Sequence, residues 1–137
     1  MKKILVIEGD DAVNNSLEAT IKSLGLEFLG SKRLMPVHEI HQLEPDVVLL
    51  EHRLPFGFGG DLCKELKTDP RTRNIKVILT STYQGISKVA RENLADGYLH
   101  KPFDPDTLTA TVSKFLTDHE TILPSISKRS FWDALKV

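Results

Sequence analysis

Residues 46–60 of this 137-residue chain read DVVLLEHRLPFGFGG. Four apolar residues, 47–50, follow an acid, and Glu51 ends the run. A short apolar run between polar residues predicts a strand that is buried on both faces of a parallel sheet. Glu51 is therefore expected to present its carboxylate at one edge of that sheet. The three glycines of the following loop are expected to turn tightly, with positive φ, close to this carboxylate.

The rest of the chain alternates between short apolar runs and amphipathic helical patterns. Strands are expected near residues 4–7, 26–29, 46–51, 74–80 and 98–100, and helices near 11–24, 37–43, 61–67, 86–94 and from 104 onward. Such alternation predicts an α/β fold with a five-stranded parallel sheet and helices on both of its faces. Ligands of these folds bind at the carboxyl ends of the strands, so the residues that follow each strand are the candidates for a site.

The composition limits the classes of function. With 40% hydrophobic and 27% charged residues, the chain has the make-up of an ordinary globular domain. The net charge of -1 provides no basic field for nucleic acid or for an anionic membrane. The single cysteine, Cys63, excludes an internal disulfide and a site made of several thiolates. The N-terminal apolar run is too short for a signal peptide or a membrane span, so a cytoplasmic location is expected.

Several motifs in the second half of the chain point to one family. Residues 101–103 read KPF, Tyr98 precedes them, and residues 104–108 read DPDTL, with a proline placed for the first turn of a helix. Together with the loop after Glu51, these motifs make residues 2–117 resemble the receiver domains of response regulators. The resemblance implies the flavodoxin-like strand order 2-1-3-4-5 and a role in two-component (phosphorelay) signalling. It also implies protein partners, namely a histidine kinase, an output domain or another regulator, and a second copy of the chain is a further candidate.

The resemblance implies a metal-binding and phosphoacceptor side of the site in which two positions are altered. Glu51 stands where the family has the aspartate that is phosphorylated, and Glu8 matches the first acid of the metal-binding pair. Gly9 stands where the second acid belongs, so that ligand is missing unless Asp10 replaces it, and Asp11 is a further substitute. Any binding of Mg²⁺ is expected to be weak, and no other cofactor is expected.

The switch side of the site matches the family more fully. Lys101, followed by Pro102, matches the lysine that contacts the phosphoryl group, and Tyr98 matches the switch aromatic. Ser81 is the best match for the hydroxyl that follows the fourth strand, with Thr80 as the alternative. We expect Lys101 to form a direct ion pair with Glu51, because an unpaired carboxylate in a partly buried cleft is costly.

Glu51 decides which function is expected. Its additional methylene moves the carboxylate by up to about 1.5 Å relative to an aspartate, and a misplacement of about 1 Å can slow a positioned reaction on the order of a hundredfold. We therefore expect an atypical, non-enzymatic interaction module that does not depend on phosphorylation. Whether Glu51 is a permanent partial mimic of a phosphoryl group or belongs to a disused site stays open. The alternatives are a receiver phosphorylated on a non-standard carboxylate with Mg²⁺, and a small metal-dependent hydrolase.

The receiver-like domain is expected to span residues 1–117, with residues 118–137 as a C-terminal tail. The tail ends in an apolar segment that contains Phe131, Trp132, Leu135 and Val137. Left in water, these side chains would expose a large apolar surface, so a short helix or turn docked on the domain or on a second copy is expected. A frayed terminus is the alternative.

Overall fold

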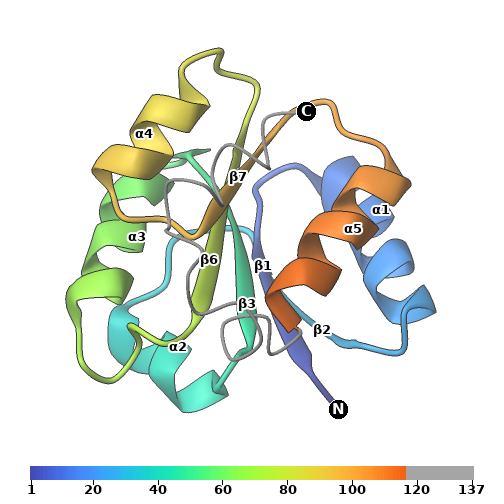
Figure 1. The fold of residues 1–137 in the computed structure, drawn as a ribbon, viewed down its shortest axis with the longest axis horizontal. Coiled ribbons are helices and arrows are strands. Elements are labelled where there is room, and N and C mark those ends of the chain that lie inside the picture. Colours follow the sequence, from blue (N-terminus) through green and yellow to red (C-terminus); the bar gives the residue numbers. More distant parts are fainter. Residues whose placement is uncertain (117–137) are drawn as a thin grey trace, which may run out of the picture.

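The computed structural model describes residues 1–116 and contains one five-stranded parallel sheet between two layers of helices (Figure 1). The sheet order is β2-β1-β3-β6-β7, in which β6 and β7 are the fourth and fifth strands of this sheet along the chain, so the predicted order 2-1-3-4-5 is confirmed. The strands of this sheet are β1 (Lys3–Ile7), β2 (Glu27–Ser31), β3 (Val47–Glu51), β6 (Lys76–Ser81) and β7 (Gly97–His100). The helices are α1 (Asp11–Ser23), α2 (Val37–Leu43), α3 (Gly59–Thr68), α4 (Ile86–Glu92) and α5 (Pro105–Leu116).

The helices divide between the two faces of the sheet because successive strand residues point to opposite faces. In β3, Val48 and Leu50 face a core cluster with residues from α2, α3 and α4, whereas Val47 and Leu49 face a second cluster with residues from α1 and α5. All five residues of β3 are buried, as the uninterrupted apolar run predicted. The central strand therefore carries Glu51 at its end with little freedom to move.

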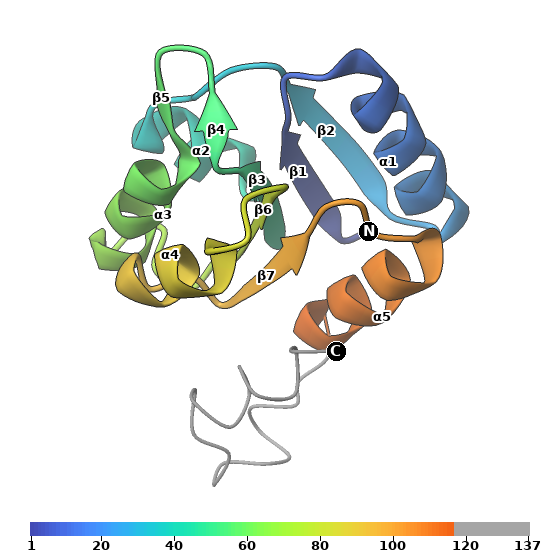
Figure 2. The same cartoon turned by 90° about the horizontal axis from the view of Figure 1, so that it is seen from above.

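The segment after β3 differs from the predicted loop. It contains a short antiparallel hairpin of β4 (Arg53–Leu54) and β5 (Gly57–Phe58), which extends beyond the carboxyl ends of the sheet (Figure 2). The positive φ of this segment, 68°, belongs to Phe56 and not to a glycine. The helix α3 begins at Gly59, two residues before the predicted start. A Cβ on Gly59 would lie 2.1 Å from the carbonyl oxygen of Glu51, so the glycine is needed for close packing rather than for positive φ.

Within residues 1–116, no helix combines the length and the apolar character that a membrane crossing requires. The tail residues Phe131 and Trp132 lie outside the described residues, as does the expected docking of that segment.

A buried ion pair fastens the amino-terminal end of the sheet to α3. The Nζ of Lys67 lies 2.8 Å from Oδ2 of Asp96, and the two side chains are only 8% and 11% exposed. The same ammonium donates to the carbonyl oxygens of Arg73 and Ile75, and Asp96 accepts from the backbone N–H of Val77. The charges are therefore compensated by several hydrogen bonds, as buried charges require.

We expect Lys67→Met to lower the free energy of unfolding by about 3–5 kcal/mol, because it leaves the carboxylate of Asp96 buried without its cation. Urea unfolding followed by circular dichroism measures this loss. The matched control is Lys88→Met on α4, which removes an exposed ion pair with Glu92 and should cost less than about 0.5 kcal/mol. Equal losses in the two variants would contradict the account of the buried pair.

Candidate functional site

The carboxyl ends of β1, β3 and β7 bring together two carboxylates and one ammonium group. The Nζ of Lys101 lies 2.8 Å from Oε2 of Glu51, so the predicted ion pair is confirmed. Lys101 also donates to Oε1 of Glu8, which the sequence did not predict. The three side chains are 6–14% exposed. One ammonium group is therefore shared by two nearly buried carboxylates.

Backbone hydrogen bonds between neighbouring strands hold this triad in place. The N–H of Glu8 donates to the carbonyl oxygen of Ser31 at 3.0 Å, and the N–H of Lys101 donates to that of Ser81 at 2.8 Å. The peptide bond between Lys101 and Pro102 is cis. Glu51 is thus the last residue of its strand, and Glu8 and Lys101 directly follow theirs. Because the sheet is rigid, their charged groups can move only by rotation of their own side chains.

The hydroxyl that contacts Glu51 belongs to Thr80 and not to Ser81, which sequence matching preferred. Thr80 Oγ1 donates to Glu51 Oε2 at 3.2 Å, as expected from the pairing of these two residues across β3 and β6. Ser81 is buried, and its Oγ accepts from the N–H of Tyr83 at 3.1 Å. Because neighbouring residues of a strand point to opposite faces, only one of the two hydroxyls is able to face Glu51.

Asp10 and Asp11, the expected substitutes for a metal ligand at position 9, make other contacts. Asp10 caps α1 by accepting from the N–H of Val13 at 3.0 Å, and Asp11 pairs with Lys32. Gly9 has room for a side chain, because a Cβ there would meet its nearest neighbours only at 3.6 and 3.9 Å. The absence of a carboxylate at position 9 therefore reflects the residue type and not the space available to a side chain.

The oxygens of Glu8 and Glu51 are largely engaged as well. Glu8 Oε2 accepts from the N–H of Asp10 at 3.1 Å, its Oε1 faces Lys101, and Glu51 Oε2 faces both Lys101 and Thr80. In the described part of the chain, no three His, Cys, Asp or Glu side chains are grouped to hold a metal ion. Mg²⁺ requires near-octahedral oxygen coordination, and this arrangement does not fit it.

The electrostatics of the site favour the charged form of Lys101. Burial by itself lowers the pKa of this ammonium group, but hydrogen bonds to Glu51 and Glu8 and their negative charges outweigh burial, and the pKa is raised. The ion pairs with Glu51 and Glu8 therefore stabilise the protonated form of Lys101.

Aromatic side chains occur in the segments that follow β3 and β6. The guanidinium of Arg53 lies 5.1 Å from the ring centre of Tyr83, a cation–π contact that joins the segments following β3 and β6. His52 stacks on Phe58, and its Nδ1 accepts from the N–H of Gly60. Burial of the imidazole, and then the charge of Arg53, lower the pKa of His52.

Tyr98, matched to the switch aromatic, is half-buried and packs against the core cluster on the α3 and α4 side.

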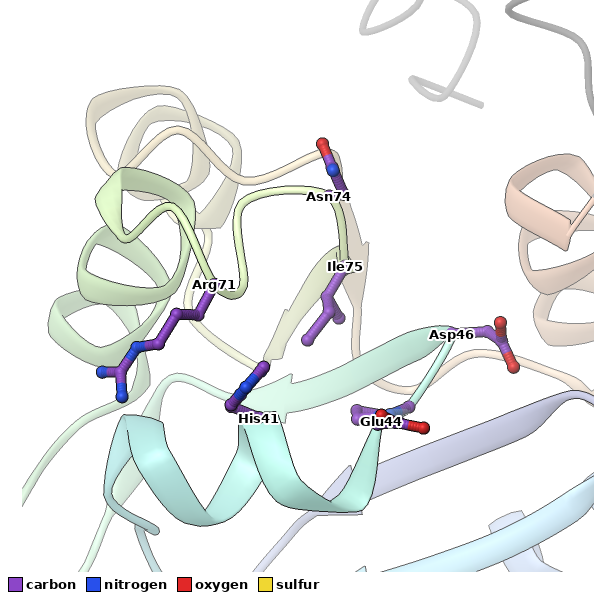
Figure 3. Close-up of a pocket in the computed structure, with 7 residues that line it drawn as sticks. His41, Glu44, Asp46, Arg71, Asn74 and Ile75 are labelled. Atoms are coloured by element: carbon purple, nitrogen blue, oxygen red, sulfur yellow. The ribbon is translucent and has the colours of Figure 1, made fainter.

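A surface hollow of about 320 Å³ lies at the opposite end of the sheet (Figure 3). Its lining includes His41 of α2, Asp46 before β3 and Arg71 after α3. It is shallow, mixes both signs of charge and contains none of the residues of the triad. The charged residues at the carboxyl-end edge of the sheet therefore do not line this hollow.

The family model of the response regulator receiver domain matches residues 4–113. The chain belongs to this receiver family. Receiver domains of response regulators are signalling modules of two-component systems rather than enzymes, and the fold described above is the flavodoxin-like fold of such domains.

Two curated relatives illustrate the similarity. The DNA-binding dual master transcriptional regulator RpaA of Synechocystis is 33% identical over 138 residues, which cover 95% of this chain and 55% of that protein. The phosphate regulon transcriptional regulatory protein PhoB of Escherichia coli is 30% identical over 114 residues, covering 81% of this chain and 50% of that protein. The receiver chain thus spans about half the length of the curated relatives it matches.

Two solved structures show the same fold. A putative response regulator from Chloroflexus aurantiacus superposes with a TM-score of 0.75 at 26% identity, covering 84% of this chain and 97% of that one. The receiver domain of the sensor histidine kinase PA1611 from Pseudomonas aeruginosa, solved with magnesium in its active-site cleft, gives 0.75 at 22% identity. That alignment covers 83% of this chain and 96% of the other. The second likeness supports the fold alone.

The raised pKa of Lys101 predicts a loss of stability in alkali. The folded state holds the proton more tightly than the unfolded chain, so the contribution is fully present below the ordinary lysine value of 10.5 and is lost as the pH rises through the raised pKa. We expect the urea midpoint of the wild type to fall as the pH rises above 10.5. Other lysines and tyrosines titrate in both proteins, so the difference in midpoint between wild type and Lys101→Met isolates the contribution of Lys101. This difference should shrink over the same pH range, because Lys101 loses its charge there. A difference that grows with pH would contradict the assignment.

Proposed function

We propose that this receiver is an atypical protein-interaction module that works without phosphorylation, with Glu51 in the place of the phosphoacceptor aspartate. The observation that carries this proposal is the shared ammonium of Lys101, which contacts Glu51 and Glu8 together. A phosphoryl acceptor needs a correctly placed carboxylate oxygen to attack and a cation to neutralise the incoming charge. Here Lys101 and Thr80 both contact Oε2 of Glu51, and the residues around it do not fit Mg²⁺.

The contacts of Glu51 favour a permanent partial mimic over a disused site. In working receivers the lysine and the hydroxyl contact the phosphoryl oxygens, and here both Lys101 and Thr80 contact a carboxylate oxygen of Glu51. A carboxylate provides one negative charge, whereas a phosphoryl group provides about 1.5 to 2. Glu51 would thus hold part of the activated arrangement without a phosphodonor.

Partners are proposed on the same basis. The curated relatives are longer and are named as transcriptional regulators, so an output domain, a histidine kinase or another regulator are the candidate partners of this receiver. The net charge of -1 gives no support for direct contact with nucleic acid.

Incubation with a small acyl-phosphate donor and Mg²⁺ should give no phosphoryl adduct on the wild type, because the longer side chain of Glu51 misplaces its carboxylate and the second metal ligand is missing. Intact-mass spectrometry measures this. A stoichiometric, hydroxylamine-labile adduct on Glu51 would overturn the proposal and support phosphorylation of a non-standard carboxylate.

The positive control is the double variant Gly9→Asp/Glu51→Asp, which restores both positions and for which Gly9 has room. It should gain affinity for Mg²⁺ in a calorimetric titration. Turnover of a generic phosphoester by the wild type would instead favour the small metal-dependent hydrolase.

The mimic is tested by Glu51→Gln, which keeps the shape and removes the charge. If the charge of Glu51 holds the ends of β6 and β7, the amide chemical shifts of residues 80–83 and 98–101 should change together in a ¹⁵N NMR spectrum. Glu92→Gln, on the exposed face of α4, is the control and should change only its immediate neighbours. Changes in Glu51→Gln that stop at Thr80 and Lys101 would indicate a disused site.

A further inference from the structure

The β4–β5 hairpin extends beyond the sheet (Figure 2), and Phe56 lies in its two-residue turn with a fully exposed side chain. Phe56 follows Pro55 and has a φ of 68°, a turn position at which glycine or asparagine is preferred. In residues 1–116, the other non-glycine residues with positive φ, Glu44 and Leu94, lie within two residues of the ends of α2 and α4, where this conformation is common. Phe56 therefore buries no surface in the fold and has an unfavourable backbone conformation.

Phe56 belongs to a larger exposed surface. Arg53 and Phe58 are paired across the hairpin, so their side chains project from the same side of it. The guanidinium of Arg53 also lies 5.1 Å from the ring centre of Tyr83. Phe58 and Tyr83 are 53% and 44% exposed. We call the surface made by Arg53, Phe56, Phe58 and Tyr83 the aromatic face. Exposed apolar groups gathered in this way, together with arginine, are typical of sites that bind another protein.

The base of the hairpin is fixed to the sheet. The N–H of His52 donates to the carbonyl oxygen of Thr80 at 2.9 Å, and the N–H of Gly59 donates to that of His52 at 2.6 Å. Beneath the hairpin, the side chain of Leu34 packs so closely that a Cβ on Gly57 would lie 2.6 Å from it. The aromatic face is therefore preformed, which lowers the entropy that a partner must overcome on binding.

The charge of the aromatic face determines which partner it fits. Residues 52–58 and 81–85 contain no acidic residue, and Arg53 is their only charged residue when histidine is neutral. A symmetric dimer through this face would bring two Arg53 guanidinium groups together, and like charges across an interface are unfavourable. A partner with carboxylates beside an apolar surface would instead form charge-assisted hydrogen bonds with Arg53.

We propose that the aromatic face binds an acidic amphipathic helix of a protein partner, with Phe56 as the apolar anchor. Four apolar side chains on one face of a helix form a hole that accepts a single protruding side chain. Carboxylates beside the apolar stripe would then reach Arg53. This docking surface rests on the proposed function, in which the receiver is an interaction module, and adds to it the surface and the class of partner.

The test is a titration of the full chain with two synthetic helical peptides that share one leucine stripe and carry either glutamate or lysine beside it. We expect the glutamate peptide to bind with a Kd below about 1 mM, at least about tenfold more tightly than the lysine peptide. In a ¹⁵N NMR spectrum it should shift the amide signals of residues 53–58 and 83. Phe56→Asn, which suits a positive φ, should weaken this binding at least about tenfold without lowering the urea midpoint. Arg53→Glu should reverse the preference between the peptides.

Leu94→Asn is the matched control, because it removes an exposed apolar side chain at positive φ from the other end of the sheet. It should leave peptide binding unchanged, and circular dichroism confirms the fold of each variant. No binding of the glutamate peptide, equal binding of both peptides, or wild-type affinity in Phe56→Asn would overturn the inference. A dimer in sedimentation equilibrium that Phe56→Asn dissociates would assign the face to a second copy and overturn it as well. None of these measurements uses a phosphodonor, so failure of the inference and failure of the proposed function are distinguishable.

Discussion

The electrostatic arrangement of this receiver depends on the sharing of one ammonium group by two buried carboxylates. Glu8, Glu51 and Lys101 come from three strands, and each would carry an uncompensated charge if its partners were removed. The contacts of Thr80 and the engagement of the neighbouring acids follow from this arrangement. The ammonium of Lys101 thus compensates part of the negative charge of the two carboxylates from within the chain.

The fold was largely predictable because buried strands have a recognisable sequence pattern, a short apolar run between polar residues. The apolar run of β3, bounded by polar residues, is distinct enough to identify the strand and to place Glu51 at its end. The ion pair between Glu51 and Lys101 was predictable for the same reason, since both residues occur at carboxyl ends. The periodicity of the sequence was sufficient for these features because each of them requires only the position of a residue along its strand.

Other features of the site depend on details that periodicity does not contain. The choice between Thr80 and Ser81 depends on the register of β6 against β3, and a shift of one residue exchanges the two faces. The contact between Lys101 and Glu8 depends on the rotamer of the long lysine side chain. The hairpin β4–β5 pairs only two residues on each strand, which is too short to leave an alternating pattern. The positive φ at Phe56 was not predicted, because the neighbouring glycines adopt positive φ more readily and were expected to have it.

The ion pairs of Lys67 and Lys101 together restrain β7, the four-residue strand at the edge of the sheet. Asp96, immediately before β7, pairs with Lys67, and Lys101, immediately after it, pairs with Glu8 and Glu51. Edge strands are ordinarily the places where a sheet frays or pairs with another chain. Here neither sliding along β6 nor peeling from one end is possible without separating a buried ion pair. The edge of this sheet is thus fixed in register at both ends, and its opening is coupled to the more global unfolding of the domain.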